Sequence, residues 1–300
     1  MPLPNFLILG VAKAGTTSLH AYLAQHPQIY MSPRKEPHFF AYGEEPLPDF
    51  EGPDIQHARQ RAIPTFAAYQ SLFAGWTNEL ALGEASTSNF TARACERMHA
   101  YLPDARLILI LRQPADRAYS QFLHMQRMGL EPLTDFAQAL ANEEARNEAP
   151  WLPVITYTRS GFYARILQQY LDCFPREQLR IYLYEEWEAQ TLPVLQDIFG
   201  FIGVDPGFVP DTAIRLNTAA VPRNRWLLRF LRNAHPLKPW LKPLLPAHWR
   251  QRTARALSTY NLTNPPPFDP HLRAQLTQLY RHDIQQTATL IGRDLSHWLA

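Results

Sequence analysis

Two glycines near the start of the chain are spaced like those of a phosphate-binding loop. The stretch 5–19 reads N-F-L-I-L-G-V-A-K-A-G-T-T-S-L, in which Gly10 and Gly15 are separated by four residues. A glycine-rich turn before a helix binds anions through unpaired backbone N–H groups and the positive end of the helix. In the common loop a lysine follows the second glycine, whereas here Thr16 takes that place and Lys13 lies inside the loop. The pattern predicts an anion site; the alternative is a plain strand-to-helix turn.

A second basic position follows the most apolar strand expected in the chain, 106–111. Arg112 comes directly after this strand, and Ser120 lies farther along the next expected helix. Because parallel strands present their ligands at their carboxyl ends, we expect Arg112 beside Lys13. A nucleotide kinase would place a Mg²⁺-binding acid here. A cation predicts a second anion subsite and no metal, although Arg112 could instead pair with Asp116.

A loop rich in ionisable groups, 32–40, supplies the candidates for acid–base chemistry. It reads S-P-R-K-E-P-H-F-F, with two prolines and a final aromatic pair that can anchor it to the core. Lys35, Glu36 and His38 are then expected near the surface. A positioned carboxylate such as Glu36 could remove a proton from an acceptor, and His38 is the nearest alternative base. The other interpretation is a solvated connecting loop.

These residues follow expected strands, and the expected strands alternate with helices along the chain. Such alternation predicts one α/β domain with a central parallel sheet flanked by helices. Apolar residues at helical spacing predict core contacts for Phe162, Ile166, Tyr170 and Phe174, and for Leu272, Leu276, Leu279, Ile284 and Ile291. We expect strands at 6–9, 28–31, 80–83, 106–111 and 179–184, and helices at about 16–25, 65–73, 91–101, from 114, 134–146, 158–173, 191–203 and 269–291.

Composition favours a soluble chain in a reducing compartment. Of the 300 residues 46% are apolar, yet no run approaches the roughly 18 residues that span a bilayer. Cys95 and Cys173 are the only cysteines and lack metal-ligand spacing, so we expect neither a disulfide framework nor a metal site. These features predict a cytoplasmic protein, and no nucleic-acid partner is expected.

A basic segment, 212–268, stands apart from the rest of the chain. It holds ten Lys or Arg and no Asp or Glu, although the net charge of the chain is only +2. We expect a proline-rich helical insertion that closes over an anionic acceptor or contacts a membrane surface, with a structural cap as the alternative. Taken alone, the segment would also fit a non-catalytic module that binds polyanions or membranes.

Four stretches of the chain, in this order, resemble the sulfotransferases that use 3′-phosphoadenosine 5′-phosphosulfate (PAPS), most closely the bacterial and heparan-sulfate group. K-A-G-T-T-S at 13–18 resembles the 5′-phosphosulfate loop, and K-E-P-H-F-F at 35–40 resembles the loop with the catalytic glutamate. L-I-L-I-L-R-x-P-x-x-R-x-x-S at 107–120 resembles the 3′-phosphate strand and helix. The C-terminal L-I-G-R-D-L-S-H-W-L is also similar.

The resemblance implies a metal-free sulfuryl transfer from PAPS, which leaves adenosine 3′,5′-bisphosphate. Lys13 would contact the bridging oxygen, Arg112 and Ser120 would hold the 3′-phosphate, and Glu36 would be the general base. Arg223 would close over the cofactor. The 5′-phosphate would bind the backbone and hydroxyls of the loop, formed by Ala14, Gly15, Thr16, Thr17 and Ser18.

The acceptor is less defined by the resemblance. The related 3-O-sulfotransferases carry a lysine in an E-K-T-P stretch, and Ala85 stands at that position here. We therefore expect a hydroxyl- or amine-bearing acceptor, such as a carbohydrate or glycolipid, without assuming heparan sulfate. A P-loop-like nucleotide kinase is the alternative enzyme, but it would need a lysine after Gly15.

Overall fold

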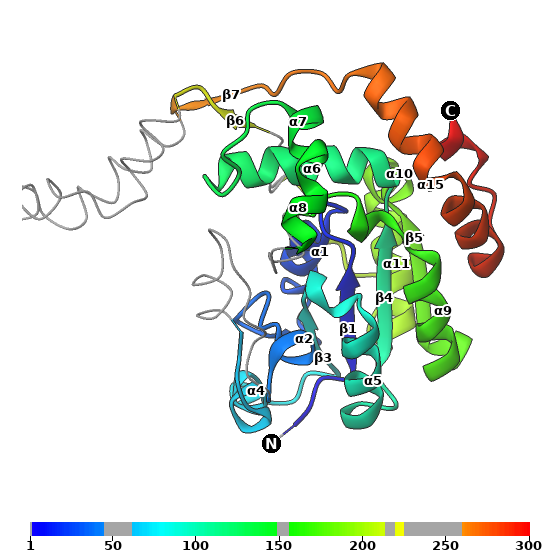
Figure 1. Ribbon diagram of the computed structural model, residues 1–300. Helices are drawn as coiled ribbons and strands as arrows, with labels where there is room; N and C mark the ends of the chain where they lie inside the picture. Colours follow the sequence, from blue (N-terminus) through cyan, green and yellow to red (C-terminus); the bar gives the residue numbers. More distant parts are fainter. Residues whose placement is uncertain (1, 45–61, 149–155, 214–219, 225–259) are drawn as a thin grey trace, which may run out of the picture.

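A five-stranded parallel sheet runs through the middle of the protein (Figure 1). The computed structural model describes residues 2–44, 62–148, 156–213, 220–224 and 260–300. The strand order is β2-β3-β1-β4-β5, which places β1 and β4 at the centre. Both are almost wholly buried, as expected for apolar strands covered on two faces. The strands are β1 (Phe6–Gly10), β2 (Ile29–Met31), β3 (Ala81–Ala85), β4 (Arg106–Leu111) and β5 (Leu179–Leu183).

Helices cover both faces of this sheet. The chain moves from β1 to β2 in one direction and from β3 to β4 in the other, so right-handed crossovers place their helices on opposite faces. The helices are α1 (Thr16–Leu23), α2 (Phe39–Tyr42), α4 (Phe66–Gln70), α5 (Ala92–Tyr101), α6 (Pro114–Arg127), α7 (Phe136–Ala141), α8 (Glu143–Glu148), α9 (Ala164–Cys173), α10 (Tyr184–Ala189), α11 (Thr191–Ile202) and α15 (Pro270–Ile291). Short 3₁₀ turns occur at Ser71–Phe73, Thr87–Asn89 (η2), Arg159–Gly161, Arg176–Gln178 and Ser296–Leu299 (η6).

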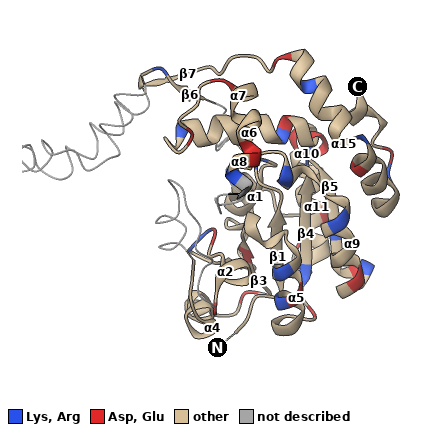
Figure 2. Ribbon diagram, in the orientation of Figure 1, with Lys and Arg blue, Asp and Glu red and all other residues tan. Residues whose placement is uncertain are grey.

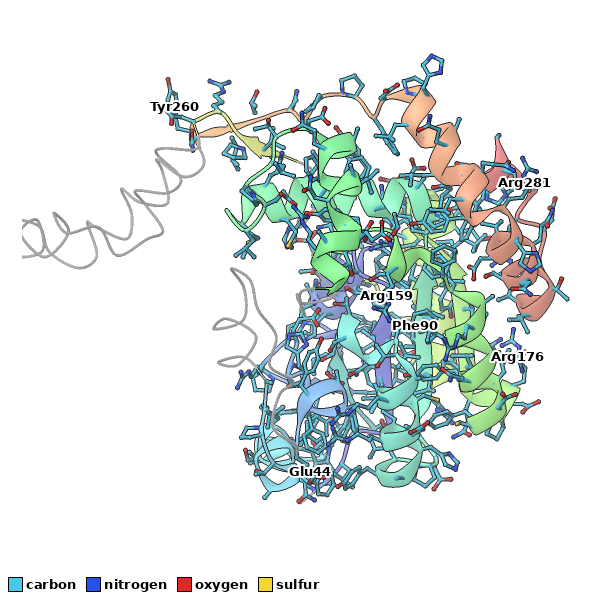
Figure 3. All side chains as sticks on the ribbon, viewed as in Figure 1. Glu44, Phe90, Arg159, Arg176, Tyr260 and Arg281 are labelled. Carbon is cyan, nitrogen blue, oxygen red and sulfur yellow. The ribbon has the colours of Figure 1, made fainter. Side chains whose placement is uncertain are left out.

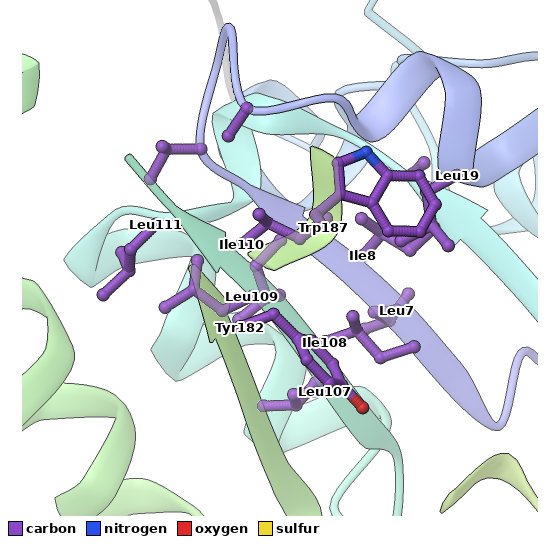
Figure 4. Close-up of a cluster of buried hydrophobic side chains, with 14 of the residues drawn as sticks. Leu7, Ile8, Leu19, Leu107, Ile108, Leu109, Ile110, Leu111, Tyr182 and Trp187 are labelled. Atoms are coloured by element: carbon purple, nitrogen blue, oxygen red, sulfur yellow. The ribbon is translucent and has the colours of Figure 1, made fainter. Parts of the chain in front are cut away.

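The core fills the space between the sheet and these helices. Figure 4 shows Leu7, Ile8 and Ile108 from the two central strands packed near Leu19 of α1 and Trp187 of α10. Figure 2 shows that charged residues lie mainly on helices and at strand ends, whereas the middle of the sheet is largely uncharged. Most charged groups therefore lie on the helices and at the ends of the strands.

The expected α/β fold with a central parallel sheet is confirmed, with several local corrections. The helix expected at 134–146 is two helices, because Asn142 adopts a turn conformation that ends α7. The helix expected at 158–173 begins only at Ala164, after a 3₁₀ turn. Tyr184 starts α10 rather than ending β5. Phe162 and Leu279, expected in the core, are 39% and 52% exposed.

Most of the basic segment lies outside the described residues. Its described parts include a short antiparallel pair, β6 (Val221–Pro222) and β7 (Leu262–Thr263). Its first residues are joined to α1, where the Tyr22 hydroxyl donates to the Thr212 carbonyl at 3.2 Å. The expected helical character of the segment and its closing role stay predictions. In the described part of the chain, no helix is long and apolar enough to cross a membrane.

Candidate active site

The phosphate-binding loop predicted after the first strand joins β1 to α1. Gly15 precedes α1 with a φ of 84°, a left-handed conformation that glycine adopts without steric cost. As the N-cap residue, Gly15 also has no side chain that could cap the first turn of this helix. Its leading N–H groups and the Thr17 and Ser18 side chains, both partly buried, are thus placed where an anion could accept hydrogen bonds.

Trp187 of α10 lies directly against this loop. A Cβ on Gly15 would come within 2.5 Å of the Trp187 Nε1 atom. The indole also packs against Tyr22 of α1, with ring centroids 6.0 Å apart. Glycine is therefore required at position 15 both by its φ and by the close approach of the Trp187 indole. Sequence analysis missed Trp187 because it lies between the expected strand 179–184 and the expected helix 191–203, in a stretch assigned to no element.

Lys13 is the most strongly perturbed cation of the loop. Burial, reinforced by the nearby charges of Arg112, Arg127 and Lys35, lowers the pKa of its ammonium to about 8. Because these neighbours are all cations, they add repulsion to the cost of burying the ammonium. An anion bound beside Lys13 would remove that penalty, and the residues present therefore fit an anionic ligand.

Arg112 connects the loop to the neighbouring strand. Its Nη1 donates to the Lys13 carbonyl at 2.7 Å, and its guanidinium lies 4.4 Å from the centroid of the Tyr184 ring. The alternative pairing with Asp116 is wrong, because Asp116 pairs with Arg273 at 3.0 Å. Since β1 and β4 are adjacent central strands, both basic groups lie where the direction of the crossovers reverses, the usual ligand position in open α/β sheets.

Ser120 and Arg223 occupy less central positions. Ser120 lies in α6, partly buried, and α6 packs against β6. The Arg223 side chain is exposed and lies 6.0 Å from the Tyr260 ring centroid, while its backbone N–H donates to Asn261. Tyr260 stands at the outer end of the β6–β7 pair (Figure 3). The structure therefore does not join Arg223 to the loop around Lys13.

Glu36 is held by Lys35 and Thr87 at the carboxyl end of β3. Its Oε1 lies 2.7 Å from the Lys35 ammonium, and its Oε2 accepts from the Thr87 backbone N–H at 2.8 Å. Its side chain is 16% exposed, so the carboxylate is partly buried but accessible. The charge of Lys35 also helps to lower the pKa of Lys13. Because Lys35 pairs with Glu36, the carboxylate and the loop around Lys13 belong to one electrostatic site.

His38 lies beside this carboxylate but is engaged elsewhere. Its Nδ1 is 2.8 Å from the Ser88 hydroxyl and 3.7 Å from Glu36 Oε2. Lys35, Glu36 and His38 were expected near the surface, and their side chains are 23%, 16% and 17% exposed. Glu36 is thus better placed as a base, with His38 as a neighbour.

The arrangement can bind an anion, stabilise charge that develops on it and remove a proton nearby. Cations and helix N–H groups provide the first two effects in a partly dry site. Among the described residues, no group of three or more His, Cys, Asp or Glu could hold a metal ion. The sequence interpretation did not identify Lys35 or Thr87 as partners of the base, although Lys35 stands in the quoted stretch 32–40.

Comparisons with known proteins give the family of this chain. The sequence model of the sulfotransferase family matches residues 4–208. Bifunctional heparan sulfate N-deacetylase/N-sulfotransferase 2 of Mus musculus is 31% identical over 216 residues, which cover 68% of this chain and 22% of that protein. Carbohydrate sulfotransferase 15 of Homo sapiens is 25% identical over 305 residues, which cover 84% of this chain and 52% of the human protein. The chain thus spans less than a quarter of the first relative and about half of the second.

A solved structure is similar over the whole chain. The crystal structure of a sulfotransferase from Alicyclobacillus acidocaldarius has a TM-score of 0.78 and 34% sequence identity, with 100% of both chains covered. The family match includes β1 to β5, the loop around Lys13, Glu36 and Arg112. The chain therefore belongs to the sulfotransferase family and is an enzyme of that class.

Proposed function

We propose that this enzyme transfers a sulfuryl group from PAPS to a hydroxyl or amine of a carbohydrate acceptor. The observation that carries the proposal is the hydrogen bond between Arg112 and the Lys13 carbonyl, which joins the two predicted anion-binding positions at the ends of adjacent strands. A donor with a 5′-phosphosulfate and a 3′-phosphate needs two such positions. The Lys13 loop would hold the first group, and Arg112 with Ser120 would hold the second.

The residues of the loop would stabilise the leaving group. In an in-line transfer, the bond from sulfur to the bridging phosphate oxygen breaks as the bond from sulfur to the acceptor forms. Negative charge then grows on the leaving phosphate, where the Lys13 ammonium and the N–H groups of α1 can offset it. A metal ion is not needed for this role.

Glu36 would accept the proton that the acceptor loses. Its Oε2 is held by the Thr87 N–H, while the Lys35 ammonium pairs with Oε1. A positioned base of this kind contributes about 10²–10⁴ in rate. The proton therefore moves to the carboxylate without a second protein group.

A carbohydrate acceptor is supported by the names of the relatives. One is a heparan sulfate N-sulfotransferase and the other a carbohydrate sulfotransferase. Ala85 lacks the cation expected from the 3-O-sulfotransferases, so the acceptor site of this chain differs from theirs. Mass spectrometry of candidate sugars incubated with labelled PAPS would identify the acceptor and the sulfated atom.

Nucleotide binding tests the donor. Adenosine 3′,5′-bisphosphate should bind without Mg²⁺ and more tightly than AMP, because an arginine–phosphate contact is worth about 1.5–3 kcal/mol. Arg112→Ala should remove most of this difference and leave AMP binding unchanged in calorimetry. Mg²⁺-dependent ATP binding, or equal affinity for AMP and the bisphosphate, would instead favour a kinase.

A further inference from the structure

A buried carboxyl group, Glu84, has no role in the proposed transfer. It lies near the end of β3 and is 1% exposed. Its Oε2 accepts from the Ser86 hydroxyl at 2.9 Å, and its Oε1 accepts from Asn89 Nδ2 at 2.6 Å. Burying a carboxyl group is costly unless its hydrogen bonds are satisfied. Both oxygens of this group are satisfied by the turn that follows β3.

The Ser86 hydroxyl connects Glu84 to the loop that carries Glu36, the proposed base. Because its single proton is donated to Glu84, its oxygen is left to accept, and the His38 backbone N–H donates to it at 3.3 Å. Two further contacts join the same turn to Glu36. The Glu36 N–H donates to the Ala85 carbonyl at 2.9 Å, and the Thr87 N–H donates to the Glu36 carboxylate.

The loop needs such support because its backbone is strained. Glu36 and His38 have φ values of 58° and 57°, a left-handed conformation that costs non-glycine residues roughly 1–2 kcal/mol each. Strain of this kind persists only where surrounding contacts fix the chain. Here those contacts come from residues 85–87, immediately after Glu84.

Asn89 shows how strongly Glu84 organises this turn. Its side chain is fully buried, and its Nδ2 is directed to Glu84 while its Oδ1 has no hydrogen-bond partner among the described atoms. Leaving a buried acceptor unsatisfied costs free energy. The contact with the carboxyl group therefore determines the orientation of the amide.

We propose that Glu84 is a positioning residue, which acts through Ser86 and the turn 85–89 to hold Glu36 in the orientation needed for proton removal. The inference rests on the proposed role of Glu36 as the base. It concerns the geometry of the loop and not direct contact with the donor or acceptor.

The surroundings of Glu84 give this role a pH dependence. Burial raises the pKa of the carboxyl to about 7, while its hydrogen bonds to Asn89 and Ser86 oppose the shift. The charged groups that act on it are Glu36, which raises the pKa, and Lys35, which lowers it. Tyr69 of α4 and Tyr170 of α9 also interact with it: burial raises the pKa of both hydroxyls, and the charge of Glu84 adds to the shift.

The test compares Glu84→Gln with Ser86→Ala. We expect each variant to lower kcat by about tenfold or more while the Kd of adenosine 3′,5′-bisphosphate stays within about twofold, since the nucleotide loop follows β1 and not β3. The double variant should be no slower than the slower single variant, because both changes break one chain of contacts. The rate of the wild type should fall as pH decreases through about 7, and Glu84→Gln should lose this change.

Asp197→Asn is the control for loss of a carboxylate. Asp197 accepts from the Tyr182 hydroxyl at 2.6 Å, on the β5 edge of the sheet, and its variant should retain the wild-type kcat. Wild-type kcat in a folded Glu84→Gln, or in Ser86→Ala if Glu84→Gln does not fold, would overturn the positioning role. An equal loss of nucleotide affinity and rate would also overturn it, because it would indicate general damage.

Glu36→Gln distinguishes this inference from the proposed function. Full activity in Glu36→Gln would overturn the assigned base itself. An inactive Glu36→Gln with fully active Glu84→Gln and Ser86→Ala would overturn only the positioning role.

Discussion

At the scale of single residues, the site depends on Lys13, whose burial disfavours the charged form of its side chain. The Lys13 ammonium is buried among other cations, and its pKa is lowered to about 8. The positive charge of Lys13 is therefore unfavourable in the free enzyme, and a bound anion would stabilise it. Interactions that strengthen as charge develops raise kcat rather than ground-state affinity.

We expect kcat/KM to decrease as pH rises through about 8. The protonated lysine is the active form, and it is lost when pH exceeds its pKa in the free enzyme. Lys13→Arg keeps its charge at every accessible pH and should lack this decrease, whatever its absolute rate. Lys13→Ala should lose kcat far more than affinity for the product nucleotide. Turnover equal to that of the wild type would contradict the assignment.

Glu36→Gln should retain affinity for the donor nucleotide but lose at least about a hundredfold in kcat, the low end for a positioned base. The amide keeps the shape of the side chain and cannot accept the proton. His38→Ala is the matched comparison, because His38 lies 3.7 Å from the same carboxylate. A larger loss in His38→Ala than in Glu36→Gln would reverse the two roles.

At the scale of elements, the sequence predicted the strands better than the contacts between helices. The continuous apolar run of β4 and the glycines after β1 have local signals, and both appear as expected. Helical periodicity identified α15 but could not show which of its apolar positions has a neighbour, so Leu279 was wrongly placed in the core. The Gly15–Trp187 contact joins residues far apart in the chain and has no local signal.

Gly15→Ala should weaken binding of adenosine 3′,5′-bisphosphate by at least about tenfold, because the added Cβ would displace either the loop or Trp187. Calorimetry and thermal unfolding would measure the effect. Gly292→Ala provides the control, since Gly292 has a φ of 67° and no atom within 4 Å of the added Cβ. Gly292→Ala should lower the free energy of unfolding through backbone strain alone, and its affinity for the nucleotide should stay unchanged. Equal affinity in both variants would contradict the packing role of Trp187.

At the scale of the whole molecule, the end of the chain supports both anion-binding elements. Trp298 is 2% exposed, and its indole N–H donates to Glu185 of α10, the helix that also carries Tyr184 and Trp187. Its carbonyl accepts from Gln113 at 3.2 Å, and Gln113 caps α6 directly after Arg112. The tail, 293–300, thus contacts two elements that contact the loop or Arg112.

Trp298→Ala should therefore reduce both stability and nucleotide affinity, although Trp298 has no place in the site itself. Loss of a buried tryptophan costs about 3–5 kcal/mol of unfolding free energy. The same change removes the hydrogen bond from the Trp298 indole to Glu185 of α10. Tyr184 and Trp187, which also lie in α10, should then hold Arg112 and Gly15 less firmly. Calorimetry should show a weaker complex with the bisphosphate even at temperatures where the variant is fully folded. Leu279→Ala, which removes an exposed side chain from α15, should change neither quantity. If Trp298→Ala lowers Tm but binds the bisphosphate as tightly as the wild type, the tail stabilises the fold without organising the site.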